Sequence, residues 1–263
     1  MLGKLIKHEF KATGRKLLPL CAACLVLGTL ANLALRMEAI HSSDALQVVS
    51  TIILILFGIS ILAVTVGGFV ILVLRFRDNL LTDEGYLMFS LPVSPHQLLL
   101  SKIITAALWC LIFMAVVLLS GLLAVLTPQI WTGAYQELTQ LPSRLHIDPR
   151  QMVQLAELAA QSLLLLWLLA AAILLLFYAS LAVGYSFANH KTLLSVVFFF
   201  VFFIASQIIL TLILFGGGLD FDPPSVIAGA QAALWFVTGL VAAFCGVFYL
   251  ITSLALKRRL NLN

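Results

Sequence analysis

Long apolar runs alternate with short polar segments along the whole chain. Each run is long enough to supply the roughly 17–20 residues with which a helix crosses the hydrocarbon core of a bilayer. There are six such runs: Leu17–Leu35, Val48–Leu74, Ile103–Thr127, Leu163–Ala188, Leu193–Phe215 and Ala232–Leu256. The pattern predicts an all-α membrane protein with six transmembrane helices, in a single domain that covers residues 1–263 and includes no ATPase domain.

The polar segment Arg75–Lys102 separates the second run from the third. Thr82 stands where an N-cap residue would, and two acidic residues follow it in the first turn, where the helix dipole stabilises them. Pro92 ends this helix, because the residue before a proline is pushed out of the helical region. The segment therefore predicts a short helix of about two turns at Thr82–Ser90.

Two other helix starts pair an N-cap residue with a proline at the first helical position. Ser94 and Pro95, with Gln97 in the capping-box position, predict a helix that starts well before the third run and continues through it. Asp148 and Pro149 predict the same for the fourth helix. Both helices should therefore be longer than a bilayer crossing requires.

The N-terminal arm Leu2–Lys16 has the pattern of an amphipathic helix on the inner leaflet. At about 100° per residue, one arc of the helix is basic and the opposite arc is apolar. Glu9 falls in the apolar arc, which leaves two interpretations: it reaches water at the edge of the arc, or the arc contacts protein and Glu9 has a partner there. Gly14 and Pro19 bracket a turn into the first run, so an elbow helix is expected.

Charge placement orients the predicted spans. Twelve of the fifteen Lys and Arg residues fall in the arm, the Arg75–Lys102 segment, the fourth connection or the C-terminal tail, and three fall in the other connections. This bias places both termini and the Arg75–Lys102 segment in the cytoplasm.

Composition supports a lipid bilayer as the environment of this chain. Residues are 62% hydrophobic and 10% charged, and the mean hydropathy is +1.13, whereas a soluble domain carries about 25% charged residues. The net charge of +4 does not indicate a nucleic-acid partner, because no basic run is interleaved with exposed aromatic residues.

Few groups in the sequence could perform chemistry. There is no GxxxxGKS or GxxxxGKT motif, so we expect no nucleotide to bind by that route and no catalytic, cofactor-binding or metal-binding residue. Cys21 and Cys24 form a CxxC pair, which either serves a membrane thiol oxidoreductase or packs as two small apolar residues. The six runs contain no charged residue, so transport by this chain would need an external source of energy.

Gln207 is the one side-chain amide deep in a span. It either forms a hydrogen bond with a neighbouring helix or lines a path for a substrate. The candidates for such a translocation path are Gln207, Ser206, Thr211 and Tyr178.

Two stretches, LIKHEFKATGRKLLPL and NLLTDEGYLMFSLPVSPHQLLLSK, resemble the permease subunits of bacterial ABC-2 type transporters. The resemblance implies an elbow helix at Leu2–Lys16, a coupling helix at Thr82–Ser90 and a second coupling contact at Asn189–Thr192. The elbow residues singled out by it are Lys7, Glu9 and Phe10. The implied ATPase-coupling residues are Thr82, Asp83, Glu84, Gly85, Tyr86, Leu87, Phe89, His190 and Lys191.

The resemblance also implies partners. Such permeases pair as two six-span halves, as homodimers or heterodimers, and form a twelve-span pathway for export across the bacterial inner (plasma) membrane. ATP and Mg would bind on separate ABC ATPase subunits, so this chain would be a transport subunit and not itself an enzyme. The alternatives are a membrane thiol oxidoreductase that uses Cys21 and Cys24, and a non-transporting membrane sensor or immunity protein.

Overall fold

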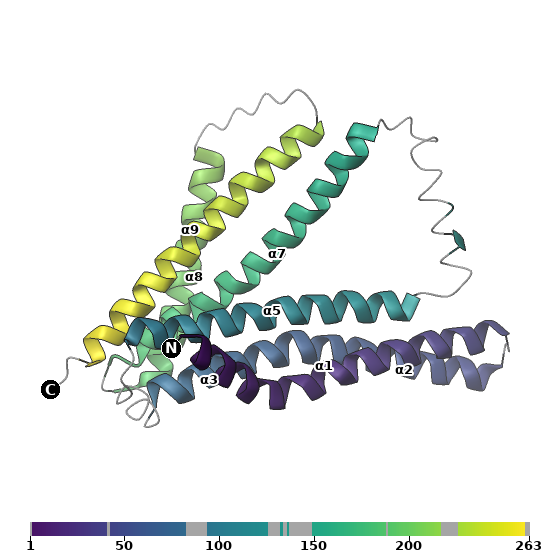
Figure 1. The fold of residues 1–263 in the computed structure, drawn as a ribbon, viewed down its shortest axis with the longest axis horizontal. Helices are drawn as coiled ribbons and strands as arrows, with labels where there is room; N and C mark the ends of the chain where they lie inside the picture. Colours follow the sequence, from purple (N-terminus) through teal and green to yellow (C-terminus); the bar gives the residue numbers. More distant parts are fainter. Residues whose placement is uncertain are drawn as a thin grey trace. The chain divides into compact units, whose positions relative to one another are not determined.

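The computed structural model describes residues 2–40, 43–82, 94–125, 132–133, 136, 149–187, 189–216 and 226–260. Within these ranges the regular structure is helical, without a strand. The long helices, drawn in Figure 1, are α1 (Leu2–Ile40), α2 (Asp44–Leu62), α3 (Gly68–Leu81), α5 (Pro95–Val125), α7 (Pro149–Gly184), α8 (Lys191–Gly216) and α9 (Val226–Leu260). Six helical stretches in the described ranges are long and apolar enough to cross a membrane, which identifies a multi-pass membrane protein by length and composition.

The two proline-marked helix starts are confirmed. α5 begins at Pro95 and α7 begins at Pro149. The backbone N–H of Gln97 lies 3.4 Å from Ser94 Oγ and 2.9 Å from the Ser94 carbonyl oxygen. Ser94 therefore caps α5 as its sequence position predicts.

No turn interrupts the helix between the N-terminal arm and the first span, and a bend of this helix into an elbow stays a prediction. α1 continues as one helix from Leu2 to Ile40, through Gly14 and Pro19. Leu17 and Cys21, on either side of the proline, are both buried. Burial of these side chains favours a continuous helix over the turn that a helix-interior proline would otherwise promote.

The second span is also continuous, but it changes its winding. α2 passes through a π-helical turn at Ala63–Gly67 into α3. A Cβ added at Gly68 would lie 2.5 Å from the Phe113 ring. Gly68 therefore permits a close approach of the second span to α5, as small residues do between membrane helices.

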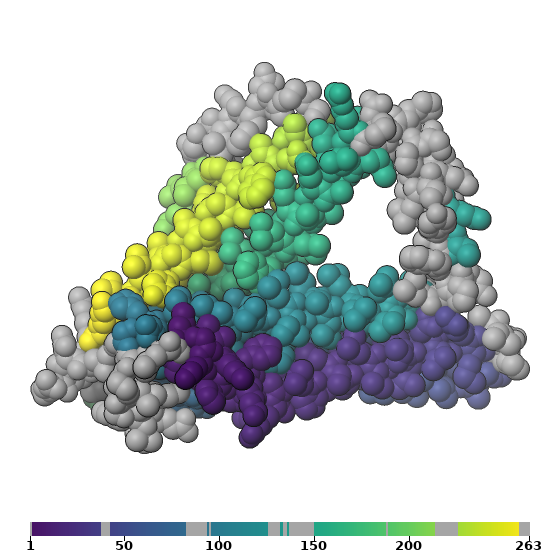
Figure 2. All heavy atoms as spheres, in the orientation of Figure 1, coloured from purple at the N-terminus to yellow at the C-terminus, as the bar shows by residue number. Residues whose placement is uncertain are grey.

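The described chain falls into two compact units, which we describe separately. Unit one comprises Met1–Glu9, Leu72–Ala107 and Leu155–Asn263, and unit two comprises Phe10–Ile71 and Leu108–Gln154. The core of unit one joins Leu175, Leu176 and Ala179 of α7 to Phe248 of α9, with α8 phenylalanines packed against them. Figure 2 shows the side chains of α7 (teal-green) and α9 (yellow) packed together in this unit.

In unit two, α1 and α5 approach closely through small and polar side chains. A Cβ at Gly28 would lie 2.7 Å from the Ser120 carbonyl oxygen. The Cys24 thiol donates to the Ser120 hydroxyl at 3.5 Å, and the Asn32 amide donates to the Ala124 carbonyl at 3.1 Å. Such cross-helix bonds hold helices together where the surrounding lipid provides no hydrophobic driving force.

The connection between α7 and α8 lies earlier than expected. α7 ends at Gly184 and α8 begins at Lys191, whereas the apolar pattern placed this turn at Asn189–Thr192. The difference arises because a Gly184 without a side chain allows the chain to fold back onto Ser195, whose Cα lies 2.5 Å from where a Gly184 Cβ would be. His190 precedes α8 with a φ of 54°, a left-handed conformation that favours glycine.

We expect His190→Gly to raise stability by about 0.5 kcal/mol, because glycine adopts a positive φ without the steric cost that a Cβ imposes. Thermal unfolding in detergent, followed by the loss of monodisperse protein, measures the change. The control is His8→Gly at an exposed site inside α1, which should lower stability by about 0.5 kcal/mol. Equal losses for both variants would contradict the strain at His190.

Candidate functional site

Most of the predicted coupling residues lie outside the described residues. These are Asp83, Glu84, Gly85, Tyr86, Leu87 and Phe89. Thr82 is described: it is exposed, it follows the last residue of α3, and its hydroxyl donates to the Asp78 carbonyl. Its expected role as an N-cap for residues 83–90 remains a prediction.

The described ends of the central segment belong to helices. Arg75 and Arg77 are part of α3, and Lys102 is part of α5. The cap at Ser94 and Pro95 had already predicted a helical Lys102, whereas Arg75 and Arg77 lay beyond the predicted second span, which in the structure continues past its apolar run. Two helical stems, α3 up to Leu81 and α5 from Pro95, therefore bracket residues 82–94.

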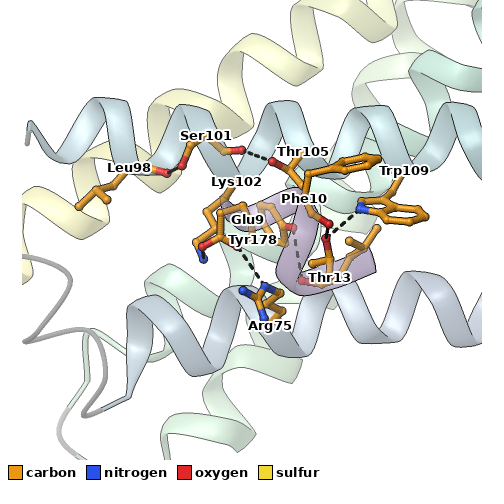
Figure 3. A network of polar contacts seen from close by, with 11 residues as sticks. Glu9, Phe10, Thr13, Arg75, Leu98, Ser101, Lys102, Thr105, Trp109 and Tyr178 are labelled. Carbon is orange, nitrogen blue, oxygen red and sulfur yellow. Dashed lines mark hydrogen bonds and ion pairs between the residues drawn. The ribbon is translucent and has the colours of Figure 1, made fainter. Parts of the chain in front are cut away.

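Glu9, at the start of α1, lies between these two stems in unit one (Figure 3). Its Oε2 accepts a hydrogen bond from Arg75 Nε at 3.0 Å, and its Oε1 accepts one from Lys102 Nζ. Glu9 is 7% exposed and Lys102 is 5% exposed. One buried carboxylate thus binds one cation from each stem, and we call Glu9, Arg75 and Lys102 the Glu9 cluster.

Asn79 completes the polar surroundings of the Glu9 cluster. With its amide oriented by its hydrogen bonds, its oxygen lies 3.0 Å from Lys102 Nζ and its nitrogen 3.2 Å from the Arg75 carbonyl oxygen. Lys102 therefore has a second acceptor from α3 in addition to Glu9. Such added partners are what a buried charge requires, because its desolvation is costly.

The two interpretations of Glu9 are thereby resolved. Glu9 is buried and pairs with Arg75 of α3 and Lys102 of α5, so its side chain faces protein and does not reach water at the edge of the arc. Its position in an apolar arc was the signal of a partner. The partners, 66 and 93 residues away, could not be identified from local patterns.

The neighbourhood of the Glu9 cluster in unit one is tightly packed. The Tyr178 ring stacks on Phe76 with 3.9 Å between centroids, and the Tyr178 hydroxyl donates to the Leu72 carbonyl at 3.4 Å. Tyr178 is 2% exposed. This candidate for a translocation path is placed in the packing between α7 and α3.

The other elbow residues are divided between the units. Lys7 is exposed in unit one. Phe10 is half-buried in unit two, where it stacks on Trp109 with 4.8 Å between ring centroids. The Trp109 indole N–H donates to the Thr13 hydroxyl at 2.8 Å (Figure 3).

The remaining predicted residues lie on α8 or immediately before it. His190 and Lys191 are exposed, as the prediction of a docking contact requires. Gln207 and Thr211 are exposed, and the Ser206 hydroxyl donates within α8 to the Phe203 carbonyl. Their role in a path stays a prediction.

The CxxC pair is buried in unit two. Cys21 and Cys24 are free thiols with little exposure, and Cys24 donates to Ser120. Attack on a disulfide requires an accessible thiolate, so this burial favours packing as the role of the pair. Across the part of the chain that the structure describes, no cluster of three or more His, Cys, Asp or Glu could hold a metal ion.

Comparisons with known proteins do not extend this description. No family model matches the chain, no curated protein matches it, and no solved structure matches it.

Proposed function

We propose that this chain is the permease subunit of an ATP-driven ABC-2 exporter in a bacterial cell membrane. It forms half of a twelve-span pathway with a second permease subunit. Separate ATPase subunits dock on residues 82–90 and on His190–Lys191, and both chain termini are cytoplasmic. The resemblance of the arm and the central segment to this family, and the positive-inside bias, motivate the proposal.

The observation that most supports the proposal is the pair of helical stems. α3 and α5 continue beyond their apolar runs and end directly beside a short polar segment. A rigid helix transmits a displacement applied at its end, whereas a flexible loop absorbs it. A protein that pushes on residues 82–94 would therefore tilt the second and third spans.

Purification of the chain with the products of adjacent genes tests the proposal. We expect a protein with a GxxxxGKS or GxxxxGKT motif, which cradles nucleotide phosphates, to co-purify with the chain in detergent. Its ATPase activity should depend on the presence of the chain. Recovery of the chain without any ATPase would overturn the proposal and leave the sensor or immunity interpretation.

Glu84→Lys should weaken retention of that ATPase by about tenfold, because a reversed charge in a docking segment replaces attraction with repulsion. Membrane insertion and monodispersity should be unaffected. The matched control is Asp44→Lys, an exposed acid in the first turn of α2, which the proposed orientation places on the opposite side of the membrane. Equal ATPase retention and turnover for wild type and Glu84→Lys would show that residue 84 is not in the docking segment.

A further inference from the structure

We infer that Glu9 is the positioning residue that holds the two stems of residues 82–94 together. One consequence of this inference rests on the proposed function: by fixing the separation of the stems, Glu9 would present residues 82–90 to the ATPase in a defined geometry. We call the pairing of Glu9 with Arg75 of α3 and Lys102 of α5 the lock. All three residues belong to unit one, so the lock does not depend on a partner protein.

The position of the cluster along the stems suits this role. Arg75 lies six residues before α3 ends at Leu81, and Lys102 lies seven residues after α5 begins at Pro95. At 1.5 Å per residue, both contacts are roughly 10 Å from the stem ends. A contact at this height controls the separation of the stem ends. Thr82, directly after α3, and Gln97, in the first turn of α5, are exposed beyond it.

The arrangement of charges makes the contact between α3 and α5 depend more on Glu9 than on either cation of the Glu9 cluster. The cluster holds two cations and one carboxylate, and each carboxylate oxygen serves a different stem. Loss of either cation leaves a neutral ion pair. Loss of the Glu9 charge removes the carboxylate that Arg75 and the buried Lys102 both contact, so α3 and α5 lose the group that joins them. It also leaves the buried Lys102 charge without this counter-charge, which is costly.

Stability alone does not account for this arrangement. Buried ion pairs can often be replaced by apolar side chains at little cost or with a gain, so their presence is weak support for a stabilising role. Here the pairs join three segments that are distant in the sequence, at the base of one short polar segment. Fixing which segments meet, and at what separation, is the role that the geometry supports.

Hydrogen exchange of the purified full-length chain tests the lock without any partner. In Glu9→Gln, amides of residues 75–82 and 96–102 should exchange at least about tenfold faster, because the stems separate and their ends open locally. Amides of α9 serve as the internal reference. Unchanged exchange in both stems would overturn the inference.

A second substitution separates the lock from simple loss of a contact. Lys102→Met removes the second cation, so Glu9→Gln/Lys102→Met should restore slow exchange although it breaks more contacts than Glu9→Gln alone. If Glu9→Gln is recovered only as unfolded protein, recovery of the double variant as folded protein supports the same conclusion. The inference would be overturned if the double variant exchanged as fast as Glu9→Gln. It would also be overturned if neither variant could be recovered as folded protein.

Glu157→Gln is the matched control. Glu157 is an exposed acid of α7 that accepts a hydrogen bond from Gln231 at 3.2 Å. It lies in unit one but outside the Glu9 cluster, so exchange in the two stems should equal that of wild type. Faster exchange there would show that any lost acid loosens unit one, which would also overturn the inference.

The ATPase readout keeps the two proposals distinct. Where an ATPase co-purifies with wild type, Glu9→Gln should retain about tenfold less of it and the double variant should regain it. Absence of any ATPase with wild type, together with the expected exchange pattern, would overturn the proposed function and leave the lock standing. Equal ATPase retention and turnover for wild type and Glu9→Gln would show that the lock does not position the docking segment.

Discussion

Gly184→Ala should prevent accumulation of the folded protein or lower its stability by about 3 kcal/mol. The added Cβ would lie 2.5 Å from both the backbone nitrogen and the Cα of Ser195. Contacts this short with backbone atoms cannot be relieved by a side-chain rotation, so the start of α8 would have to move away from the end of α7. Fluorescence-detected size exclusion after a temperature series measures the loss.

The matched controls are glycines of the same unit without close neighbours. No atom lies within 4 Å of a Cβ built at Gly239 or Gly246 of α9. Alanine at either site should raise helix stability by up to about 1 kcal/mol, because glycine is a poor helix former. Gly184→Ala as stable as Gly239→Ala would show that the α7–α8 connection is not as tight as described.

The spans themselves could be predicted from the sequence, because a bilayer imposes a simple length rule on apolar residues. Each of the six apolar runs coincides, over most of its length, with a helix that is long and apolar enough to cross a membrane in the described ranges. The starts at Pro95 and Pro149 were also predictable, because an N-cap residue followed by proline is a local signal. Features that depend on a few adjacent residues were therefore identified correctly.

Helix ends set by tertiary packing could not be predicted in this way. Gly14 and Pro19 are local signals for a turn, yet α1 continues through both because neighbouring side chains are buried. The end of α7 at Gly184 depends on an approach to Ser195, which no hydropathy window reports. In both places, packing overrides the local preference of the chain.

The sequence indicated the central residue of the candidate site, Glu9, but not its partners. Glu9 stood out because an acid in an apolar arc requires an explanation, but Arg75 and Lys102 were interpreted only as cations that orient the protein. The structure places them in helices, where they pair with Glu9. The same residues can serve both purposes, since a cation near a membrane surface orients the span and can also neutralise a buried carboxylate.

This double use is the reason that we expect the Glu9 cluster to be sensitive to single changes. The charge bias of the sequence predicts that Arg75 and Lys102 lie near the same membrane surface, and like charges on two packed helices repel each other. A carboxylate supplied by a third segment allows the helices to approach. The N-terminal arm is therefore part of the support of the central segment, in addition to any contact that its exposed basic residues make with lipid.

Tyr178→Ala should lower stability by about 3–5 kcal/mol, as expected when a large buried side chain is truncated to alanine. The ring stacks on Phe76, and the hydroxyl reaches the backbone of α3, so the substitution opens a cavity and removes a cross-helix bond. Tyr178→Phe keeps the ring and should cost about 1 kcal/mol, the net value of one hydrogen bond. Thermal unfolding of the purified chain in detergent measures both.

The control and a second measurement separate packing from a role in translocation. Phe200 is 56% exposed on α8, so Phe200→Ala should cost less than about 1 kcal/mol. If Tyr178 serves packing, Tyr178→Phe should leave the turnover of a co-purified ATPase close to that of wild type, because the fold is retained. Stability equal to wild type in Tyr178→Ala, with altered ATPase turnover, would contradict the packing role and place Tyr178 on the path that its sequence position first suggested.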